Sequence, residues 1–388
     1  MTWNVKVGPN ALHPTSNIQY LTSNIQKGWL EMAKVAVAMS GGVDSSVAAY
    51  LLQEAGHQVI GLTMQLWSDQ GKEKERPGFQ TAVKDARQVA DRLGFPHYTL
   101  NLQESFEQEV VQYFITEYLQ GRTPNPCVVC NRWIKFGLLI EHARSLGAKF
   151  IATGHYARVE QDKETSRYVL LRGIDPRKDQ SYFLYDLSQE QLRYIIFPLG
   201  QYSKTDIRQL AERLKLKVAD KPDSQEVCFI DNNNYREFLK QRVASQIRPG
   251  PFLDQQGRCL GQHQGLPFYT VGQRKGLGLA LGRPMYVVQI IPEENAVVLG
   301  DNKELYSRRV WAANNNFIPF ADLNAALKVE AKIRYAAAPA TAVIQPAAGN
   351  QVLIEFDLPQ RAVTPGQAVV YYQDNLVVGG GTIVRSEE

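Results

Sequence analysis

Cysteine and histidine are scarce in this chain, whose 388 residues contain four Cys and six His. So few cysteines exclude the disulfide framework of a small secreted protein. They favour a reducing, cytoplasmic compartment, in which a retained thiol is more often chemical than structural. No apolar run approaches the ~20 residues that a membrane-spanning helix needs, so we expect no membrane partner.

The chain also carries little excess charge. Lysine and arginine outnumber aspartate and glutamate by 43 to 39, which gives a net charge of +4. This balance is compatible with a nucleic-acid partner but does not identify one. The hydrophobic content of 44% is that of a globular protein, and the length predicts two or three domains.

The first 31 residues differ from the rest. Thr15–Gln19 repeats as Thr22–Gln26, and Glu31 is the only acidic residue of this segment. The segment has neither the apolar core of a signal peptide nor the arginines of a transit peptide. Met32 directly precedes the first predicted strand and is a candidate start. We expect residues 1–31 to be a disordered, dispensable leader.

A glycine-rich turn follows the first apolar run. Residues 35–38 are strand-like and open into small side chains before a helix predicted over Ser45–Ala55, with Asp44 as its N-cap. Gly41 and Gly42 let the backbone approach a ligand, and the amides of the turn and helix start suit a phosphate or pyrophosphate. The Gly-Lys-Ser/Thr ending of a Walker A loop is absent. An ordinary strand–turn–helix corner is the structural alternative.

Strand-like and helix-like stretches alternate from Lys34 to about Leu216. The predicted strands are 35–39, 58–64, 97–102 and 149–153, and the predicted helices are 45–55, 80–93, 104–119, 134–146 and 205–214. This alternation predicts an α/β domain with a doubly wound parallel sheet and a ligand at the carboxyl ends of its strands. Asp44, Met64 and Gly154-His155 follow or end such strands, so we expect them to converge on one crevice.

The pattern changes after Pro222. We expect a first domain over 32–222, a small central α+β domain over 223–303 with one good helix near 235–243, and a third domain over 304–388. In this last part Pro and Gly punctuate alternating strand-like runs, which predicts a small closed β-barrel. The strand-like runs are 329–336, 342–345, 352–356, 368–372 and 376–384.

Three of the four cysteines stand in suggestive contexts. Cys127 and Cys130 lie in a Pro-rich segment before a helix, which predicts a loop that presents both thiols. The helix start and the neighbouring Arg132 predict a lowered thiol pKa. Cys228 precedes Phe229-Ile230, and its structural alternative is a small buried hydrophobe.

A metal site is the main alternative for the cysteines. Zinc sites usually offer two close pairs of ligands, and the second pair is missing because Cys228 and Cys259 are 31 positions apart. An iron–sulfur cluster held by Cys127, Cys130 and Cys228 stays open. We favour catalytic thiols and no resident metal.

Several segments together resemble the bacterial tRNA-specific 2-thiouridylases, a family of PP-loop ATP pyrophosphatases. They are the turn at 38–46, Thr-Pro-Asn-Pro-x-x-x-Cys-Asn at 123–131, Ala152–Arg158, Lys178–Phe183, Asp223-Ser-Gln, Cys-Phe-Ile at 228–230 and Tyr269–Leu277. The resemblance implies ATP-dependent 2-thiolation of the wobble uridine of tRNA. The 2-oxygen would be adenylated, a protein persulfide would supply sulfur, and AMP and pyrophosphate would be released.

The resemblance also implies roles for single residues. Cys228 would hold the persulfide and Cys130 would be the nucleophile that releases its terminal sulfur, after which a Cys130–Cys228 disulfide closes the turnover. The ATP contacts would be Ala38, Met39, Ser40, Gly41, Gly42, Val43, Asp44, Ser45, Met64 and Gly154, with Mg²⁺ as a further cofactor. The target base would meet Asn125, Pro126 and Cys127. The other tRNA contacts would be His155, Lys178, Asp179, Gln180, Arg334, Tyr335 and Gln367.

One departure from the family pattern concerns Cys127, because many members have Asp there and a thiol cannot replace a carboxylate in proton transfer. The partners implied are tRNA and a persulfide-carrying donor protein. Two other functions remain as alternatives. A PP-loop ligase acting on a small substrate would not need Cys130 or Cys228, and a non-catalytic RNA-binding protein with a structural metal would release no AMP.

Overall fold

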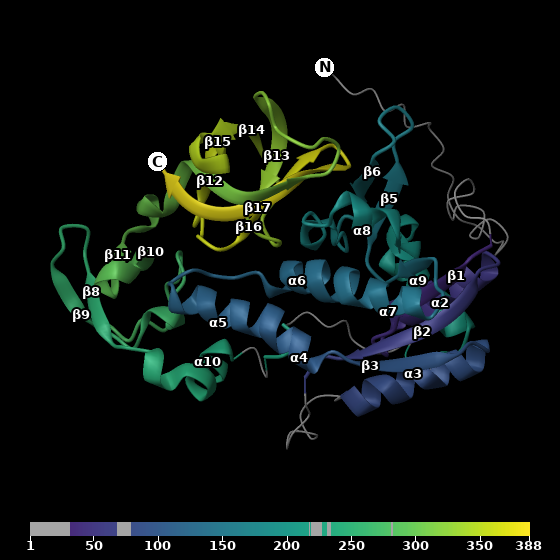
Figure 1. Ribbon diagram of the computed structural model, residues 1–388. Coiled ribbons are helices and arrows are strands. Elements are labelled where there is room, and N and C mark those ends of the chain that lie inside the picture. The colour runs from purple at the N-terminus through teal and green to yellow at the C-terminus, as the bar shows by residue number, and fades with distance from the viewer. Residues whose placement is uncertain (1–31, 68–78, 217, 219–226, 231–233, 281) are drawn as a thin grey trace.

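The computed structural model describes residues 32–67, 79–216, 218, 227–230, 234–280 and 282–388. Figure 1 shows three parts: a sheet with helices at one end, a β-rich part at the other end, and a barrel above the helices that run between them. Asp223-Ser-Gln and the leader at 1–31 lie outside the described residues.

The N-terminal part is built on a five-stranded parallel sheet with the order β3-β2-β1-β4-β7. Its strands are β1 (Lys34–Ala38), β2 (Gln58–Gln65), β3 (His97–Asn101), β4 (Phe150–Ala152) and β7 (Ile195–Ile196). The chain leaves β1 toward β2 on one side and reaches β4 on the other side. In such sheets a ligand binds at this reversal of strand order, beyond the carboxyl ends of the strands.

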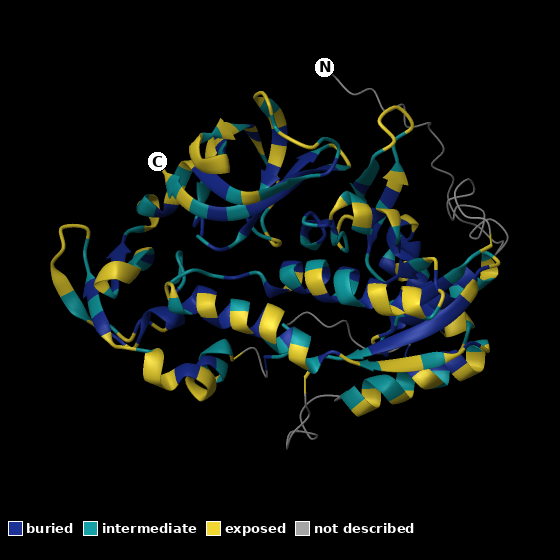
Figure 2. Ribbon diagram, in the orientation of Figure 1, coloured by how far each residue is buried: buried dark blue, intermediate teal, exposed yellow. Residues whose placement is uncertain are grey.

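Helices cover both faces of this sheet. The helices of the N-terminal part are α2 (Val43–Glu54), α3 (Phe79–Leu93), α4 (Gln103–Phe106), α5 (Gln112–Leu119), α6 (Pro126–Val129), α7 (Leu139–Ser145), α8 (Gln189–Arg193) and α9 (Lys204–Arg213), with the π-helices η2 (Glu107–Val111) and η3 (Cys130–Leu138). Val35 and Val37 pack with α2, α3 and α9, whereas Ala36 packs with α7 on the opposite face. The doubly wound α/β fold predicted from the sequence is therefore confirmed. Figure 2 shows β1 and β2 as buried, with exposed residues along the outer side of α3.

Two predictions about local structure are wrong. The first is the helix expected over 134–146, which begins eight residues earlier, at Pro126. The second is the extended loop expected around Asn125-Pro126, where the proline instead occupies the first position of a helix. Cys127 therefore lies in α6, and Cys130 opens the π-helix η3. The helix expected over 104–119 is present as the run α4–η2–α5.

The middle part contains α10 (Tyr235–Val243), as the sequence predicts, and a four-stranded sheet of order β10-β11-β8-β9. The strands are β8 (Gly250–Leu253), β9 (Cys259–His263), β10 (Tyr286–Ile291) and β11 (Ala296–Gly300). This part shares a hydrophobic core with α5, whose Phe114 and Tyr118 pack among Leu239, Phe252 and Phe268.

The C-terminal part is a closed antiparallel barrel of six strands, β12-β15-β14-β13-β16-β17, which β12 closes by pairing with β17. The strands are β12 (Tyr306–Phe317), β13 (Leu327–Lys332), β14 (Ala340–Ala347), β15 (Gln351–Arg361), β16 (Ala368–Gln373) and β17 (Leu376–Glu387). The predicted barrel is confirmed, although the sequence did not predict β12. Closure leaves no free edge in the barrel.

The hairpin of β5 (Ala157–Gln161) and β6 (Tyr168–Arg172), which the sequence also did not predict, joins the barrel to the N-terminal part. Leu171 of β6 pairs with Leu376 of β17, so the hairpin extends the sheet of the barrel. Short 3₁₀ helices complete the fold at η4 (Ser181–Phe183), η5 (Pro198–Gln201), η7 (Ala244–Gln246), η8 (Leu266–Phe268), η9 (Pro292–Glu294), η10 (Asn302–Leu305) and η11 (Ala348–Asn350). Within the described residues, no helix is long and apolar enough to cross a membrane.

Candidate active site

The turn after β1 is a close-packed corner that needs glycine. Gly41 has a φ of +70°, and a Cβ there would lie 2.7 Å from the carbonyl oxygen of Ala82 in α3. Gly42 is the N-cap of α2 and adopts an extended conformation. The prediction of Asp44 as N-cap is therefore wrong, since the helix begins at Val43. Asp44 lies in the first turn of α2, and its carboxylate bonds Tyr156 and Lys204 instead of capping the helix.

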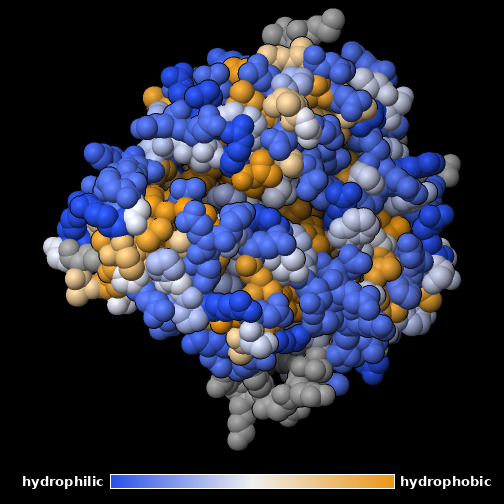
Figure 3. All heavy atoms as spheres, turned by 60° about the vertical axis from the view of Figure 1, so that its left-hand side comes forward, coloured by the Kyte–Doolittle hydropathy of each residue, from blue (hydrophilic) through white to orange (hydrophobic). Residues whose placement is uncertain are grey.

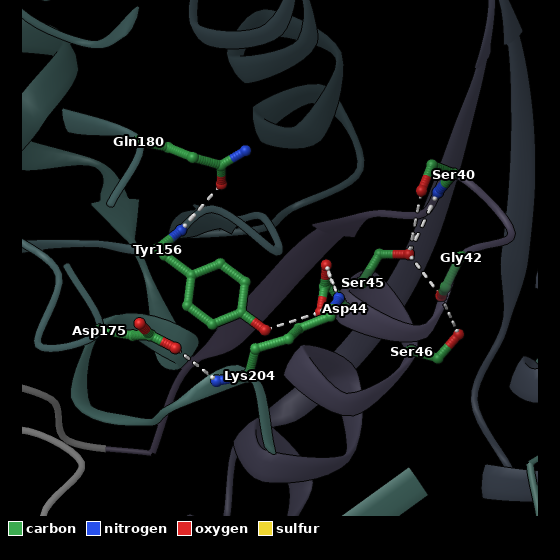
Figure 4. Close-up of polar contacts among 9 residues, drawn as sticks. All are labelled: Ser40, Gly42, Asp44, Ser45, Ser46, Tyr156, Asp175, Gln180 and Lys204. Atoms are coloured by element: carbon green, nitrogen blue, oxygen red, sulfur yellow. Dashed lines mark hydrogen bonds and ion pairs between the residues drawn. The ribbon is translucent and has the colours of Figure 1, made fainter. Parts of the chain in front are cut away.

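Serine hydroxyls brace this turn from inside (Figure 4). The Oγ of Ser45 accepts a hydrogen bond from the N–H of Ser40 at 3.3 Å and donates to the carbonyl of Gly42 at 3.3 Å. Ser46 donates to the same carbonyl at 2.8 Å. These contacts hold the turn at the N-terminus of α2, where the amides and the helix dipole favour an anion.

The Asp44 carboxylate is held by two residues far along the chain. The Lys204 ammonium donates to both carboxylate oxygens at 2.8 Å, and the Tyr156 hydroxyl donates to Oδ1 at 2.8 Å (Figure 4). The Lys204 side chain is only 8% exposed and that of Asp44 30%. Lys204 was not among the site residues predicted from the sequence. Its one signal is the capping box of Ser203 and Asp206, which begins α9 and orients its first residue.

The segment 175–180 is fixed beneath the same site. The N–H of Lys204 donates to Asp175 at 3.1 Å, and the N–H of Tyr156 donates to the Gln180 side chain at 3.1 Å (Figure 4). Asp179 accepts hydrogen bonds from the N–H groups of Gly173 and Ser181. The side chains of Asp179 and Gln180 are thus partnered within the protein rather than forming a solvated turn.

The predicted convergence at the carboxyl ends of β1 and β4 is confirmed by Gly154. A Cβ on Gly154 would lie 2.8 Å from Asp44 and from the N–H of Ser45, so only glycine permits this approach. Met64, near the end of the adjacent strand β2, is half-buried and packs against two cores. Ala38 ends β1 between them.

The three cysteines of the sequence motifs lie together. Cys127 and Cys130 are both close enough to Cys228 to raise the pKa of its thiol, which places the segment 227–230 beside α6 and η3. Cys130 is buried, whereas Cys127 and Cys228 are exposed, and all three are free thiols. Phe229 packs at 5.6 Å from Phe106 and 5.3 Å from Phe114, measured between ring centroids, and so anchors the segment. The alternative of Cys228 as a buried hydrophobe is wrong.

Removal from water by the surrounding protein dominates the acidity of these thiols, including Cys127 and Cys228, which keep part of their surface exposed. It raises the pKa of Cys130 to about 11 and that of Cys228 to about 12, and it also raises the pKa of Cys127. The Lys135 ammonium opposes this effect at each thiol. The prediction that Arg132 lowers a thiol pKa is wrong, because its guanidinium donates to both oxygens of Asp186 at 2.8 Å.

The segment before Cys127 is clamped by the other two parts of the chain. The Gln367 side chain, at the start of the barrel strand β16, donates to the carbonyls of Thr123 at 3.0 Å and Pro124 at 3.2 Å. Thr123 also contacts the Thr270 hydroxyl of the middle part at 3.2 Å. All three parts therefore meet at the residues that lead into Asn125 and the thiols.

A surface cluster lies where the barrel faces the N-terminal part. Tyr335, which is 40% exposed, packs with its ring centroid 4.5 Å from that of Phe183 in a tilted arrangement, and Lys332 lies 5.4 Å from the centroid of the Tyr335 ring. Lys178 and Asp179 both act electrostatically on Tyr335. The structure thus brings together predicted tRNA contacts from segments more than 150 residues apart.

Arg334, His155, Asn125 and Pro126 are more constrained. Arg334 donates to the carbonyls of Arg361 and Ala362 at 3.1 and 3.3 Å. Asn125 bonds the Tyr182 hydroxyl, and Pro126 is buried. Burial and the Lys135 charge hold the pKa of His155 well below its usual range, so its imidazole is neutral.

Across the described residues, no group of three or more His, Cys, Asp or Glu side chains could hold a metal ion. Cys127, Cys130 and Cys228 share a site, but in this conformation they do not form a ligand set for a cluster.

Comparisons with known proteins give the chain a family. Three family models match in order: a tRNA methyl transferase HUP domain over 33–232, a tRNA methyl transferase PRC-barrel domain over 236–301, and an aminomethyltransferase beta-barrel domain over 307–383. The chain is 55% identical to the tRNA-specific 2-thiouridylase MnmA of Moorella thermoacetica, covering 89% of this chain and 98% of that protein. It is 56% identical to the protein of that name from Heliobacterium modesticaldum, over 91% of this chain and 92% of that protein. It is 53% identical to the one from Carboxydothermus hydrogenoformans, over 91% of this chain and 98% of that protein. The chain therefore belongs to the tRNA-specific 2-thiouridylase family.

Proposed function

We propose that this protein is a tRNA-uridine 2-sulfurtransferase that adenylates the 2-oxygen of the wobble uridine with ATP and then replaces it with sulfur. One observation carries the proposal: a turn suited to an anion and a site of three thiols occur in one chain. Lys135 acts on the thiols and on His155, and the adjacent Gly154 lies against the turn. Membership of the thiouridylase family supports the same reaction.

The nucleotide half of the reaction belongs to the turn of Ser40–Ser46. Its amides and the N-terminus of α2 favour the pyrophosphate of ATP, and Gly154 leaves room beside Asp44. Mg²⁺ is usually held by one or two carboxylates together with substrate phosphates. Asp44 is the carboxylate that would hold it here, and the ion would neutralise phosphate charge. Lys204 would keep Asp44 oriented.

The sulfur half belongs to the cysteines. A donor protein would leave a persulfide on Cys228, whose exposed side chain can receive it. The Cys130 sulfur would attack the Sγ of Cys228, forming a Cys130–Cys228 disulfide and breaking the persulfide bond. The terminal sulfur leaves as hydrosulfide with the electron pair of that bond and displaces AMP from C2 of the uridine. The sulfane sulfur is reduced, the two cysteines are oxidised, and a thiol reductant resets them.

The tRNA would lie across the parts of the chain that meet at Thr123. Lys178, Lys332 and Tyr335 offer positive charge and an exposed ring for phosphate and base. Figure 3 shows apolar side chains in a recessed band between the barrel and the helices, a setting suited to a base flipped out of the stack. Gln367, Asn125 and Pro126 would orient the segment that meets this base.

We further propose the boundaries 32–222, 223–303 and 304–388 for the three domains of the chain. We also propose a cytoplasmic location for the protein.

The test is mass spectrometry of nucleosides from tRNA incubated with the purified protein, ATP, magnesium and a persulfide-carrying donor protein. Anaerobically prepared protein is assayed for iron in parallel. The proposal predicts 2-thiouridine from iron-free protein. A product that requires bound iron contradicts the persulfide mechanism, and absence of any thiolated nucleoside contradicts the proposed function.

The descriptions of the family models mention methyl transfer, which provides a second reading to test. A methylated nucleoside formed from S-adenosylmethionine, with no AMP released, would favour that activity. The paired thiols favour sulfur transfer, because methyl transfer from such a donor does not need a persulfide.

A further inference from the structure

The π-helix η3 changes which side chains share a face with Cys130. In an α-helix, residues three and four positions apart lie on one face, whereas the hydrogen bonds of a π-helix join residues five apart. Lys135 follows Cys130 by five positions, and both belong to the π-helix Cys130–Leu138. The unusual helix therefore turns this lysine toward the side that carries the thiol.

The π-helix is held in place from outside. The Gln191 side chain of α8 donates to the carbonyls of Arg132 and Phe136, both at 2.7 Å. Asn131 donates to the carbonyl of Phe183 at 2.9 Å. π-Helical turns are rare and occur frequently at functional sites. These contacts make the segment a fixed part of the fold.

Lys135 is half-buried, and the groups that face it come from three elements besides its own. They are Cys127 in α6, Cys228 in the segment 227–230 and His155 after β4. His155 is neutral, so it adds no positive charge. Among the described residues, no carboxylate forms an ion pair with Lys135. Arg132, the other cation of this helix, is turned to Asp186.

We propose that Lys135 is the electrostatic partner of Cys130 and stabilises its thiolate during the attack on the Cys228 persulfide. This inference rests on the proposed function. The attack requires Cys130 to lose its proton to solvent, which reaches the site through the exposed Cys127 and Cys228. The persulfide enters protonated and hydrosulfide leaves, while the charge of Lys135 is unchanged throughout.

The physical need for such a cation follows from the site itself. An enclosed thiol is poorly ionised at neutral pH, and only the thiolate attacks sulfur. An opposite charge within ~4–6 Å typically lowers a pKa by about 1–3 units. Removal of the Lys135 charge should therefore reduce the thiolate fraction of Cys130 by about tenfold or more at a pH below its pKa.

The test measures thiol reactivity without tRNA or ATP. The full chain is treated with methyl methanethiosulfonate between pH 7 and 10, and mass spectrometry follows modification of each cysteine. Lys135→Met and Lys135→Gln remove the charge, and Lys135→Arg retains it. Lys149→Met removes an exposed lysine at the amino end of β4, opposite the carboxyl ends of the strands. The exposed Cys259 is the internal reference.

The proposal predicts that Cys130 reacts about tenfold more slowly at pH 8 in Lys135→Met and Lys135→Gln, with a pH profile moved upward by about one unit. Lys135→Arg should remain within about threefold of the parent, and Cys259 should react equally in all proteins. An unchanged Cys130 profile in both neutral variants, or an arginine variant as slow as they are, overturns the proposal. Failure of the proposed function is separate: it appears as the parent protein forming no 2-thiouridine.

Discussion

The two reactive regions of this protein are built in opposite ways. At the turn of Ser40–Ser46, polar groups are paired, and the Asp44 carboxylate alone accepts three hydrogen bonds. At the thiol site, partial removal from water by the surrounding protein keeps the buried Cys130 and the surface-exposed Cys228 neutral, with pKa values raised to about 11 and about 12. In the proposed mechanism, the first region is organised for a charged ligand before it arrives, whereas the second holds a nucleophile that is mostly protonated at neutral pH.

The largest effect should come from the thiols. Cys130→Ser or Cys228→Ser should lower 2-thiouridine formation by at least ~10³-fold, because a hydroxyl can neither carry a persulfide nor resolve one. Cys259→Ser, at an exposed position in β9, is the matched control and should retain full activity. Nucleoside mass spectrometry measures both. If the Cys130 and Cys228 variants formed 2-thiouridine at the rate of the parent protein, the thiol site would not be the region that transfers sulfur.

The next effect concerns the ion pair of the turn. Asp44→Asn removes the carboxylate charge that pairs with the nearly buried Lys204 ammonium, so we expect a loss of about 2–3 kcal/mol in the free energy of unfolding. Replacement of both residues, Asp44→Asn with Lys204→Met, should recover most of this stability but not ATP-dependent adenylation. Urea unfolding and release of AMP measure the two properties. Equal stability of the Asp44→Asn variant and the parent would show that the pair is not needed for folding.

The pH dependence should separate the regions further. Because burial raises the pKa of Cys130 to about 11, its thiolate fraction should increase about tenfold for each pH unit between pH 7 and 9. Single-turnover sulfur transfer from preformed persulfide should follow this slope, whereas adenylation should change less than about threefold. Rapid-quench assays at each pH give both rates. A sulfur-transfer rate that is already constant below pH 8 would contradict a protonated Cys130.

The smallest effect should come from the clamp on the segment before Cys127. Gln367→Ala removes two hydrogen bonds to the carbonyls of Thr123 and Pro124, and each bond contributes ~1 kcal/mol at most. We expect a KM for tRNA about fivefold higher, with the KM for ATP unchanged. Gln373→Ala is the control, since its side chain bonds the Lys328 carbonyl at 2.9 Å in an exposed position. Equal KM values for the two variants would show that the clamp does not position tRNA.

Local patterns in the sequence predicted the turn of Ser40–Ser46 and the parallel sheet well. The apolar run before Gly41 and the alternation of strands and helices are short-range signals, and they placed Asp44 and Gly154 at one edge. The partner of Asp44 could not be found in this way, because Lys204 lies 160 residues away and the capping box beside it marks a helix start, not a contact with Asp44. The hairpin β5–β6 was missed for a related reason, since it completes a sheet whose other strands lie in the C-terminal part.

The thiol site shows a different limit. The motifs identified Cys130 and Cys228, but proximity along the chain suggested Arg132 as the nearby cation. Sequence spacing assumes an α-helix, whereas the π-helix from Cys130 turns Lys135 toward the thiols and Asp186 takes the guanidinium of Arg132. A helix type set by tertiary contacts with Gln191 is not visible in the propensities of its own residues.

The most direct test of the central claim is to stop the reaction between its two halves. Cys130→Ser protein is incubated with tRNA, sulfur donor and ATP labelled at the α-phosphate, and the tRNA is then analysed for label and for 2-thiouridine. If the turn and the thiols act in sequence, labelled adenylated tRNA should accumulate without thiolation. If the tRNA stays unlabelled, or if it is thiolated, the two regions do not perform the separate steps assigned to them.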